Sequence, residues 1–563
     1  MKIAKKTLLF GSLLCLGLTM GACTDETTGS NPGEGDEVLE TGYYAPRVVI
    51  PNSLGTKADG DLNDKEKAEN GLEGENKVQE VRLVYYNAKT GVAEYAFNYK
   101  GIHTAGTNDF NGADIYRGSD DFFTPKAEMV SIRDYKLLVI VNPNDAIKAV
   151  TKARRGTEVA TPPATDVNFY TDFENAVESG VTTNLTEFIG VANSNSVAFG
   201  ATLPERFLMT NYQGLVSIPA SRLRNTVEDA YVAATTAERV YVDRAVAKVT
   251  FAKAATVVTT PAATINNISW RLDVTNKKSY WIRHQAKMKD ATGSATSDVI
   301  DEAAVLPDHR HLLYAKDPNF DNFSKQRYLF YGPTIPTDIS NKNLGDEFRT
   351  ITESDVTLPM DDAYEYALEN TMEADEQYED VTTAAILKLS YIPAKTSLGA
   401  TLGTAGYFVW NGYVFTGAEL KTIRELDATG AGEEKYKPFL TLQKYLKDNA
   451  STLTSAFGAD FDKVLTESTP SGDISYNKDG VNYYRVLIRH FGDNLESRYM
   501  KYGRYGLVRN NLYKLTLTQV NGPGSIVLPE PKGPDDKQQY ITVDIEVLPW
   551  VVREQSVIVG GED

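Results

Sequence analysis

The chain has 563 residues and a formal net charge of −18 at pH 7, and 32 of its residues are tyrosine. This length allows two or three domains, each with a sizeable core. The acidic composition disfavours nucleic-acid binding, because binding to phosphates requires clustered Lys and Arg and the chain has no basic block. Abundant Val, Thr, Ile and Tyr, with Gly and Pro between short runs, predict a mainly β fold.

The first 23 residues have the layout of an export signal. Lysines precede an apolar run over residues 8–18, and small residues then lead to Cys23. The apolar run is too short to span a bilayer, and its ending resembles a bacterial lipoprotein box. We therefore expect residues 1–22 to be removed and Cys23 to be lipidated; an ordinary cleaved signal is the alternative. The other cysteine, Cys15, also lies here, so the remaining chain has no disulfide and no thiolate metal site.

A first strand is predicted over residues 43–50, and Pro46 within it indicates an edge position, since proline cannot donate to a β-ladder. The charged stretch that follows reads as a solvated loop, where proteases commonly cut a chain. Lys57 is the expected site for a trypsin-like enzyme.

Short apolar or alternating runs predict the strands of the body. Residues 77–86 and 93–99 form a hairpin, and 135–141, apolar on both faces, is predicted to be a central strand. The run 240–251 alternates and opens a second domain. The other predicted strands are 207–219, 265–274, 384–393, 407–415 (turning at Asn411 and Gly412), 483–489 and 512–518.

Helices are predicted in two places. Residues 145–190 look partly helical, and Phe439, Leu442 and Leu446 fall on one face of a single clear helix. The polar stretch 285–379 is expected to consist of insertions over the β core.

The end of the chain predicts a long strand that has no partner nearby in the sequence. Ile541, Val543, Ile545 and Val547 alternate with polar residues, which is the period of a half-buried strand. Pro549 removes a ladder donor and is expected to bend the strand, so that a second run begins with Trp550 and Val552. The preceding segment, 521–537, is rich in Pro and Gly and suits an extended tether. Such a tail completes either its own domain or that of a neighbouring molecule.

The sequence contains no convincing catalytic, cofactor or metal site, and we predict no enzymatic activity. His309 and His311 lack a nearby carboxylate motif, and the segment 59–63 departs from a calcium loop after its first positions. The acidic run 361–380 is interpreted as a solvated face. Residues 399–406 lack the spacing of a phosphate loop, and no nucleophile motif is present.

Four segments together resemble the fimbrillins of Bacteroidales, in particular the shaft subunit of the short fimbriae. They are Val242-Asp-Arg-Ala-Val-Ala-Lys-Val249, Tyr407-Phe-Val-Trp-Asn-Gly-Tyr-Val-Phe415, Val508-Arg-Asn-Asn-Leu-Tyr-Lys514 and Val543-Asp-Ile-Glu-Val-Leu-Pro-Trp-Val-Val552. The last two segments, in this order at the carboxy terminus, are the most specific. The resemblance implies two transthyretin-like β-sandwich domains with short helices and an extended donor strand.

The resemblance also implies how the subunit is processed. Subunits of that family are exported as lipoproteins and cut after a basic residue in the loop that follows the first strand. The groove vacated by this strand then accepts the carboxy-terminal strand of the next subunit. Here Lys57 matches the cut site, where arginine is usual, and Arg47 is the second choice. The displaced strand maps to 43–50 and the donor strand to 541–559.

The implied organisation has five parts: a signal peptide over 1–22, a lipidated propeptide over 23–57, β-sandwich domains over 58–238 and 239–520, and a linker with the donor strand over 521–563. The expected location is the outer membrane surface, with the mature form in extracellular fimbriae that support adhesion and biofilm formation. The expected partners are copies of the chain, tip and anchor subunits, a trypsin-like surface protease, and host or bacterial surface ligands. The alternatives are a surface glycan-binding lipoprotein and a tip or anchor subunit of the same fimbria.

Overall fold

The computed structural model describes residues 40–49, 73–103, 115–117, 123–157, 164–178, 185–190, 196–198, 206–212, 214–236, 239–284, 315–320, 344–361, 363–372, 377–403, 406–427, 434–490, 505–531 and the backbone of 541–549. Strands dominate these residues, so the predicted mainly β fold class is confirmed. No helix in these ranges is long and apolar enough to cross a membrane.

The first part of the described chain is built around one large sheet. Its strands and those near it are β1 (Thr41–Tyr44), β2 (Arg47–Val49), β3 (Glu80–Asn87), β4 (Ala93–Lys100), β5 (Ile102–His103), β6 (Ile115–Arg117), β7 (Phe123–Pro125), β8 (Glu128–Ser131), β9 (Tyr135–Val141), β10 (Arg155–Gly156), β11 (Val177–Glu178), β12 (Ser196–Ala198), β13 (Met209–Asn211), β14 (Val216–Ile218) and β15 (Arg239–Arg244). Its helices are α1 (Asp145–Ala149), α2 (Tyr170–Glu174), α3 (Thr186–Ile189), α4 (Val227–Thr236) and the 3₁₀ turns η2 (Glu73–Asn76) and η3 (Ala220–Arg222).

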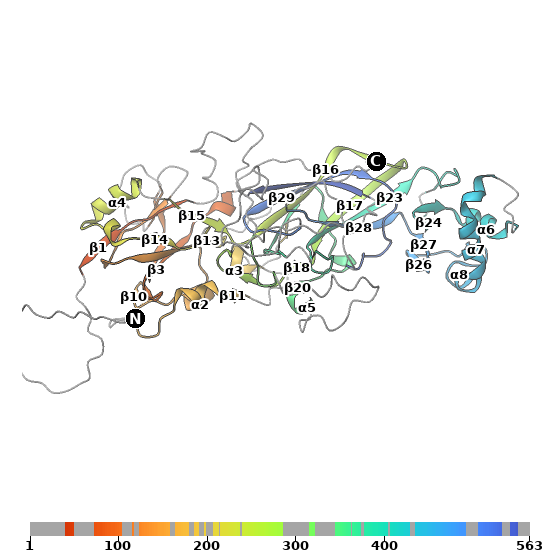
Figure 1. Cartoon of the computed structure of the whole chain (residues 1–563). Helices are drawn as coiled ribbons and strands as arrows, with labels where there is room; N and C mark the ends of the chain where they lie inside the picture. Colours follow the sequence, from red (N-terminus) through yellow and green to blue (C-terminus); the bar gives the residue numbers. More distant parts are fainter. Residues whose placement is uncertain are drawn as a thin grey trace, which may run out of the picture. The chain divides into compact units, whose positions relative to one another are not determined.

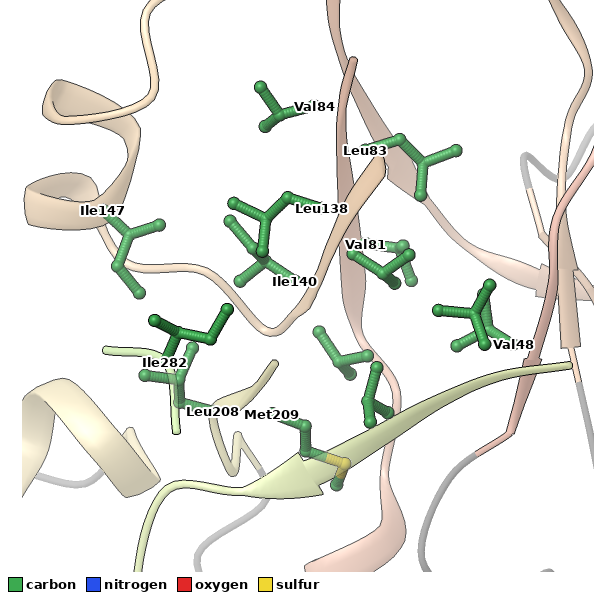
Figure 2. Close-up of a cluster of buried hydrophobic side chains, with 14 of the residues drawn as sticks. Val48, Val81, Leu83, Val84, Leu138, Ile140, Ile147, Leu208, Met209 and Ile282 are labelled. Carbon is green, nitrogen blue, oxygen red and sulfur yellow. The ribbon is translucent and has the colours of Figure 1, made fainter. Parts of the chain in front are cut away.

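The eleven-stranded sheet has the order β10-β4-β3-β9-β13-β15-β2-β7-β6-β5, and β14 also pairs with β9. The predicted hairpin is confirmed as β3 and β4, and the predicted central strand as β9, which pairs with β3 and β13. Strands β2, β3, β9 and β13 contribute buried side chains to one core, and Figure 2 draws Val48 in the same cluster as Val81, Leu138 and Met209.

The second part of the chain contains the remaining elements. Its strands are β16 (Ala247–Thr259), β17 (Ala263–Asp273), β18 (Thr275–Asn276), β19 (Ser279–Tyr280), β20 (Phe348–Arg349), β21 (Leu358–Pro359), β22 (Ala363–Ala367), β23 (Ala384–Pro393), β24 (Tyr407–Trp410), β25 (Tyr413–Phe415), β26 (Thr469–Ser471), β27 (Ile474–Asn477), β28 (Val481–Leu487), β29 (Asn511–Val520) and β30 (Ile541–Pro549). Its helices are α5 (Leu344–Glu347), α6 (Gly417–Glu425), α7 (Leu440–Asp448), α8 (Ala450–Phe457) and the 3₁₀ turns η5 (Glu353–Asp355) and η7 (Glu434–Phe439).

Two sheets, built from this part and from β12 of the first part, pack into a β-sandwich. One has the order β12-β22-β16-β29-β30 and the other the order β21-β17-β23-β28; β16 and β29 run side by side in Figure 1. A single apolar core joins the sheets, with Phe251 and Leu515 from the first and Trp270 and Leu387 from the second. Burial of such side chains is the main favourable contribution to packing two sheets together.

The predicted strand 240–251 is two strands that belong to different sheets. Strand β15 pairs with β13 and β2 in the large sheet, and β16 pairs with β22 and β29 in the sandwich. The chain changes sheet at Ala245 and Val246, which are both fully buried. Residues 41–563 form one compact unit, so the division into domains at 238 and 520 stays a prediction.

An insertion with its own aromatic core lies between the adjacent strands β23 and β28. It contains the predicted hairpin, with its turn at Asn411 and Gly412, whose φ angles of 46° and 78° suit Asn and Gly. Leu442 and Leu446 are buried on α7 as predicted, whereas Phe439 ends η7. The prediction of one helix missed α6 and α8. A capping box at the start of α6, formed by Thr416 and Glu419, was the available signal.

The interpretation of 361–380 as a solvated face is wrong. Every residue of β22, within this run, is buried between β12 and β16. Glu365 pairs with Arg349 at 3.0 Å and Glu369 with Arg509 at 3.2 Å, and both glutamates are fully buried. The carboxylates enter the interior because arginines from distant segments neutralise them. The expected stretch of insertions over 285–379 therefore also includes a strand of the β core.

Candidate functional site

The last described strand, β30, lies at the edge of the five-stranded sheet and pairs antiparallel with β29 of the same chain. The ladder extends from Ile541 opposite Val520 to Pro549 opposite Asn511, with one irregularity between Leu517 and Gln519. The structure thus shows the tail closing its own sheet, which is one of the two arrangements that the sequence left open.

The register agrees with the predicted alternation of the tail. Val543, Ile545 and Val547 lie opposite Leu517, Leu515 and Tyr513, which are fully buried in the sandwich core. The intervening positions Asp544 and Glu546 lie opposite the half-buried Thr516 and Lys514. Trp550 and Val552 follow β30 and lie outside the described residues.

The segment between β29 and β30 does not run as a free tether over its first part. The backbone of Ser525 exchanges two hydrogen bonds with Tyr483 of β28, of 2.7 and 3.0 Å. The Arg485 guanidinium donates to the carbonyl of Pro529, and the N–H of Leu528 donates to Glu353. The chain therefore crosses from β29 to β28 of the opposite sheet and is held there before it returns as β30. The expectation of an extended tether over 521–537 is wrong for the described residues up to 531.

The predicted first strand is divided in two by Ala45 and Pro46. Strand β1 pairs with β8, and Tyr43 exchanges backbone hydrogen bonds of 2.7 and 2.8 Å with Arg224. Strand β2 lies between β15 and β7, so the predicted edge position is wrong. Pro46 is tolerated because it occupies the break between the two strands, where no ladder donor is required.

Of the predicted lipidation and cleavage residues, the structure describes only Arg47. Arg47 begins β2 and pairs in register with Arg239, so a protease reaches its peptide bond only after β2 has left the sheet. Cys23 and Lys57 lie outside the described residues, as do His309, His311 and the segment 59–63.

A buried polar cluster connects the start of β29 with the segment that precedes β3. Arg244 donates from Nε to the carbonyl of Glu75 at 3.0 Å and from Nη2 to the side chain of Asn76. It also donates from Nη1 to Asn510 at 3.3 Å. Lys248 donates to the Glu75 carboxylate at 2.6 Å, so two of the motifs singled out in the sequence meet around η2.

Glu75 and Arg244 are charged at neutral pH although the cluster is buried. Burial by itself raises the pKa of Glu75, but Lys248 and Arg244 outweigh it, and the pKa is lowered from its usual 4.5. Burial lowers the pKa of Arg244 to about 10, so its guanidinium stays charged at neutral pH. Tyr366 of β22 donates to the same Glu75 carboxylate at 2.7 Å. The sequence analysis missed Glu75 and Tyr366, since nothing local to them indicates these partners.

No group of three or more His, Cys, Asp or Glu side chains in the described ranges has the arrangement of a metal site. Two features of the described residues stand out: strand β30 is paired on one side, and strand β2 is inserted between β15 and β7. A mainly β protein with one early strand inside a sheet and its last described strand at a sheet edge is the class that this fold defines.

Comparison with known proteins extends this classification. Residues 475–556, which include β28, β29 and β30, match the family model for the C-terminal region of fimbrillin, the major fimbrial subunit protein type IV. A segment of 78 residues is 36% identical to the major fimbrium subunit FimA type-5 of Porphyromonas gingivalis. Residues 475–556 are therefore similar to the C-terminal region of fimbrillins, the family that the sequence resemblance indicated. The alignment covers 14% of this chain and 19% of that relative, so the chain matches about a fifth of the relative's length.

Two solved structures align along most of the chain with low similarity. A fimbrilin from Porphyromonas gingivalis is 14% identical with a TM-score of 0.35, over 92% of this chain and 100% of that chain. The tip fimbrial protein Mfa3 of the same organism is 11% identical with a TM-score of 0.32, over 91% and 100%. These scores do not establish a shared overall fold.

Proposed function

We propose that this chain is the shaft subunit of a surface fimbria and that its copies polymerise by donating the carboxy-terminal strand. The observation that carries the proposal is that β30 is an edge strand, paired with β29 alone over nine residues. An edge strand can be exchanged between molecules without dismantling the rest of its sheet. The family match supports the proposal because it covers this strand and its partner.

Strand β2 of the first predicted strand would occupy the acceptor groove until the β30 strand of another molecule replaces it, and we call β2 the plug. Val48 and Val49 of β2 are buried, and the strand fills a position between β15 and β7. Its removal would leave unpaired backbone groups and exposed apolar side chains, which favours entry of another strand. A cut after Lys57, with lipidated Cys23 on the leaving side, would separate this plug from the body and free the body from the membrane.

The energetics make exchange sensitive to the match between strand and groove. Each large apolar side chain that becomes buried contributes roughly 1.5–3 kcal/mol, and each ladder hydrogen bond about 1 kcal/mol. Ordering a strand costs about 1–2 kcal/mol per residue. Because these contributions are of similar size, a tail already ordered in its own sheet exchanges only where the new groove matches its alternation. A head-to-tail contact of this kind does not close and yields a filament.

The docked segment up to residue 531 defines how far a donated strand can reach. The last described contact of this segment with β28 is at Pro529. A dozen residues then lead to Ile541, and such a stretch spans at most about 40 Å when fully extended. We propose that β30 leaves its own sheet while Ser525 and Pro529 keep their contacts with β28.

Limited proteolysis of the purified full chain tests the proposal. A trypsin-like protease should produce ladders on unboiled gels, and deletion of residues 541–563 should abolish them. Lys57→Gln should slow ladder formation while leaving the tail intact, which separates the role of the cut from that of the strand. Ladders that persist after the deletion would show that the tail only closes its own sheet.

We further propose that mature fimbriae of this subunit support adhesion to host or bacterial surfaces and contain tip and anchor subunits as partners. Immunogold labelling of cells with antibodies against the body tests this location. Labelling confined to the membrane, without filaments, would favour an anchor role instead.

A further inference from the structure

The sandwich has a second open side, away from both β30 and the first strand. Strand β16 has thirteen residues, but β22 pairs only with Ala247 to Thr250. Strand β17 pairs with β23 from Ala263 to Asp273, with one irregularity between Asn266 and Ser269, but β21 pairs only with Ser269 and Trp270. Because β21 and β22 follow one another directly in the chain, both sheets lose their outer strand on the same side. We name residues 254–259 and 263–268 the open edge.

One aspartate marks the beginning of the open edge. The N–H of Asp361 donates to the carbonyl of Phe251 at 3.0 Å, and its carboxylate accepts from the N–H of Lys253 at 2.7 Å. Asp361 has a φ of 71° and lies where the chain passes from β21 to β22. Beyond Lys253, no strand of the described residues pairs with β16 on this side, and on the other side the ladder with β29 is irregular between Lys253 and Val258.

The side chains along the open edge are apolar and partly exposed. Val257, Ala263, Ile265 and Ile268 pack against the sandwich core while remaining only partly buried. Val258 is 51% exposed. The edge thus offers backbone donors and acceptors beside a strip of the core that the fold leaves accessible.

The absence of charge is the most unusual property of this segment. Residues 254–270 contain no Asp, Glu, Lys or Arg, in a chain that is 24% charged and carries a net charge of −18. Soluble proteins commonly protect edge strands with charged residues, because an uncharged edge pairs with other strands. An edge without charged residues in a strongly acidic protein indicates that this edge is covered in the assembled state.

We infer that the open edge is an interface with a second copy of this chain, formed by antiparallel pairing of the two β16 strands around a twofold axis. An edge of unpaired N–H and C=O groups is complementary to itself in this arrangement. Two acidic molecules repel, and a charge-free strip is where they approach at the lowest electrostatic cost. The contact is isologous, so it joins two subunits side by side and does not use the head-to-tail donation of β30.

Sedimentation of the full, uncut chain tests the interface, since the plug is then in place. We expect a concentration-dependent dimer that strengthens with added salt, because salt screens the repulsion between the two molecules. Val258→Lys should weaken dimerisation by more than about tenfold, because it places like charges at the contact. The matched control Val464→Lys, at a position that is 89% exposed outside the open edge, should not. A wild-type chain that stays monomeric, or a Val258→Lys variant that dimerises normally, overturns the inference.

Cysteine crosslinking gives a second readout that does not depend on affinity. In a chain whose Cys15 and Cys23 are replaced by serine, single cysteines are introduced at each position from 254 to 258, with Val464→Cys as control. A twofold contact brings identical residues together, so at least one of these variants should form a disulfide-linked dimer, and the control should not. Head-to-tail donation does not juxtapose identical residues, so this result is independent of the proposed polymerisation. Absence of a crosslink at all five positions would rule out the paired β16 edges.

Discussion

Substitution of Ile545 by aspartate should release β30 from its own sheet. The residue lies opposite Leu515, which is fully buried in the sandwich core, so its register predicts an apolar environment. Losing the burial of one large aliphatic side chain costs about 1.5–3 kcal/mol, and a carboxylate at this position adds a desolvation penalty. Among the described strands only β29 pairs with β30, so a loss of 2 kcal/mol corresponds to roughly thirtyfold more opening of β30.

Hydrogen exchange of residues 511–520 measures this opening directly, because their amides on one side bond to β30. Exchange of these amides should become faster in Ile545→Asp. The control Thr542→Asp introduces the same charge opposite the half-buried Gln519 and should change exchange far less. Equal protection in Ile545→Asp and wild type would refute the reasoning, since it would mean that the observed register does not hold the strand.

Three further outcomes are expected. Val48→Asp places a carboxylate in the buried position of β2, so gel ladders should form without protease, and a requirement for cleavage would contradict the plug role. Lys248→Met leaves Glu75 buried without its ammonium partner and should lower the free energy of unfolding by about 3–5 kcal/mol at pH 7 in urea titrations. Because the pKa of Glu75 is lowered in the folded state, its ionisation stabilises the fold above pH 4.5, and this contribution is lost as the pH falls. The difference in unfolding free energy between wild type and Lys248→Met should therefore become smaller in acid. A difference that stays constant would show that the ion pair is not its source. Leu446→Ala should destabilise the insertion by about 2–5 kcal/mol, with exchange faster in α7 but unchanged in β29.

The buried polar cluster around Glu75 affects which parts of the chain a proteolytic cut would release. Glu75 lies after the predicted cut site, Lys57, in the sequence, and its bonds to Arg244 and Lys248 hold the segment before β3 in place. If the chain is cut at Lys57 as proposed, these bonds should therefore keep β3 in place while the first strand leaves. The same arginine contacts Asn510, the residue before β29, so the cluster also positions the strand that carries β30.

Several strands were predictable from the sequence because their patterns are local. The alternation in 265–274 and 384–393, the apolar run of β9 and the Asn-Gly turn between β24 and β25 reflect backbone periodicity and turn geometry. The apolar period of β30 was predictable for the same reason. The strand β22 was not, because its glutamate and tyrosines read as a polar segment until Arg349 and Arg271 approach Glu365 in the folded chain.

The sequence by itself determined many of the segments that become strands and which residues along them are apolar. Tertiary structure alone decided the order of those strands: that β2 lies inside the large sheet, that β15 and β16 belong to different sheets, and that residues 521–531 bind β28. The physical reason is that alternation specifies a face, whereas a neighbour is selected by contacts between residues far apart in the chain. For β30 the ladder is chemically the same whether its partner is the chain's own β29 or a strand of another molecule, so the pattern alone does not distinguish them.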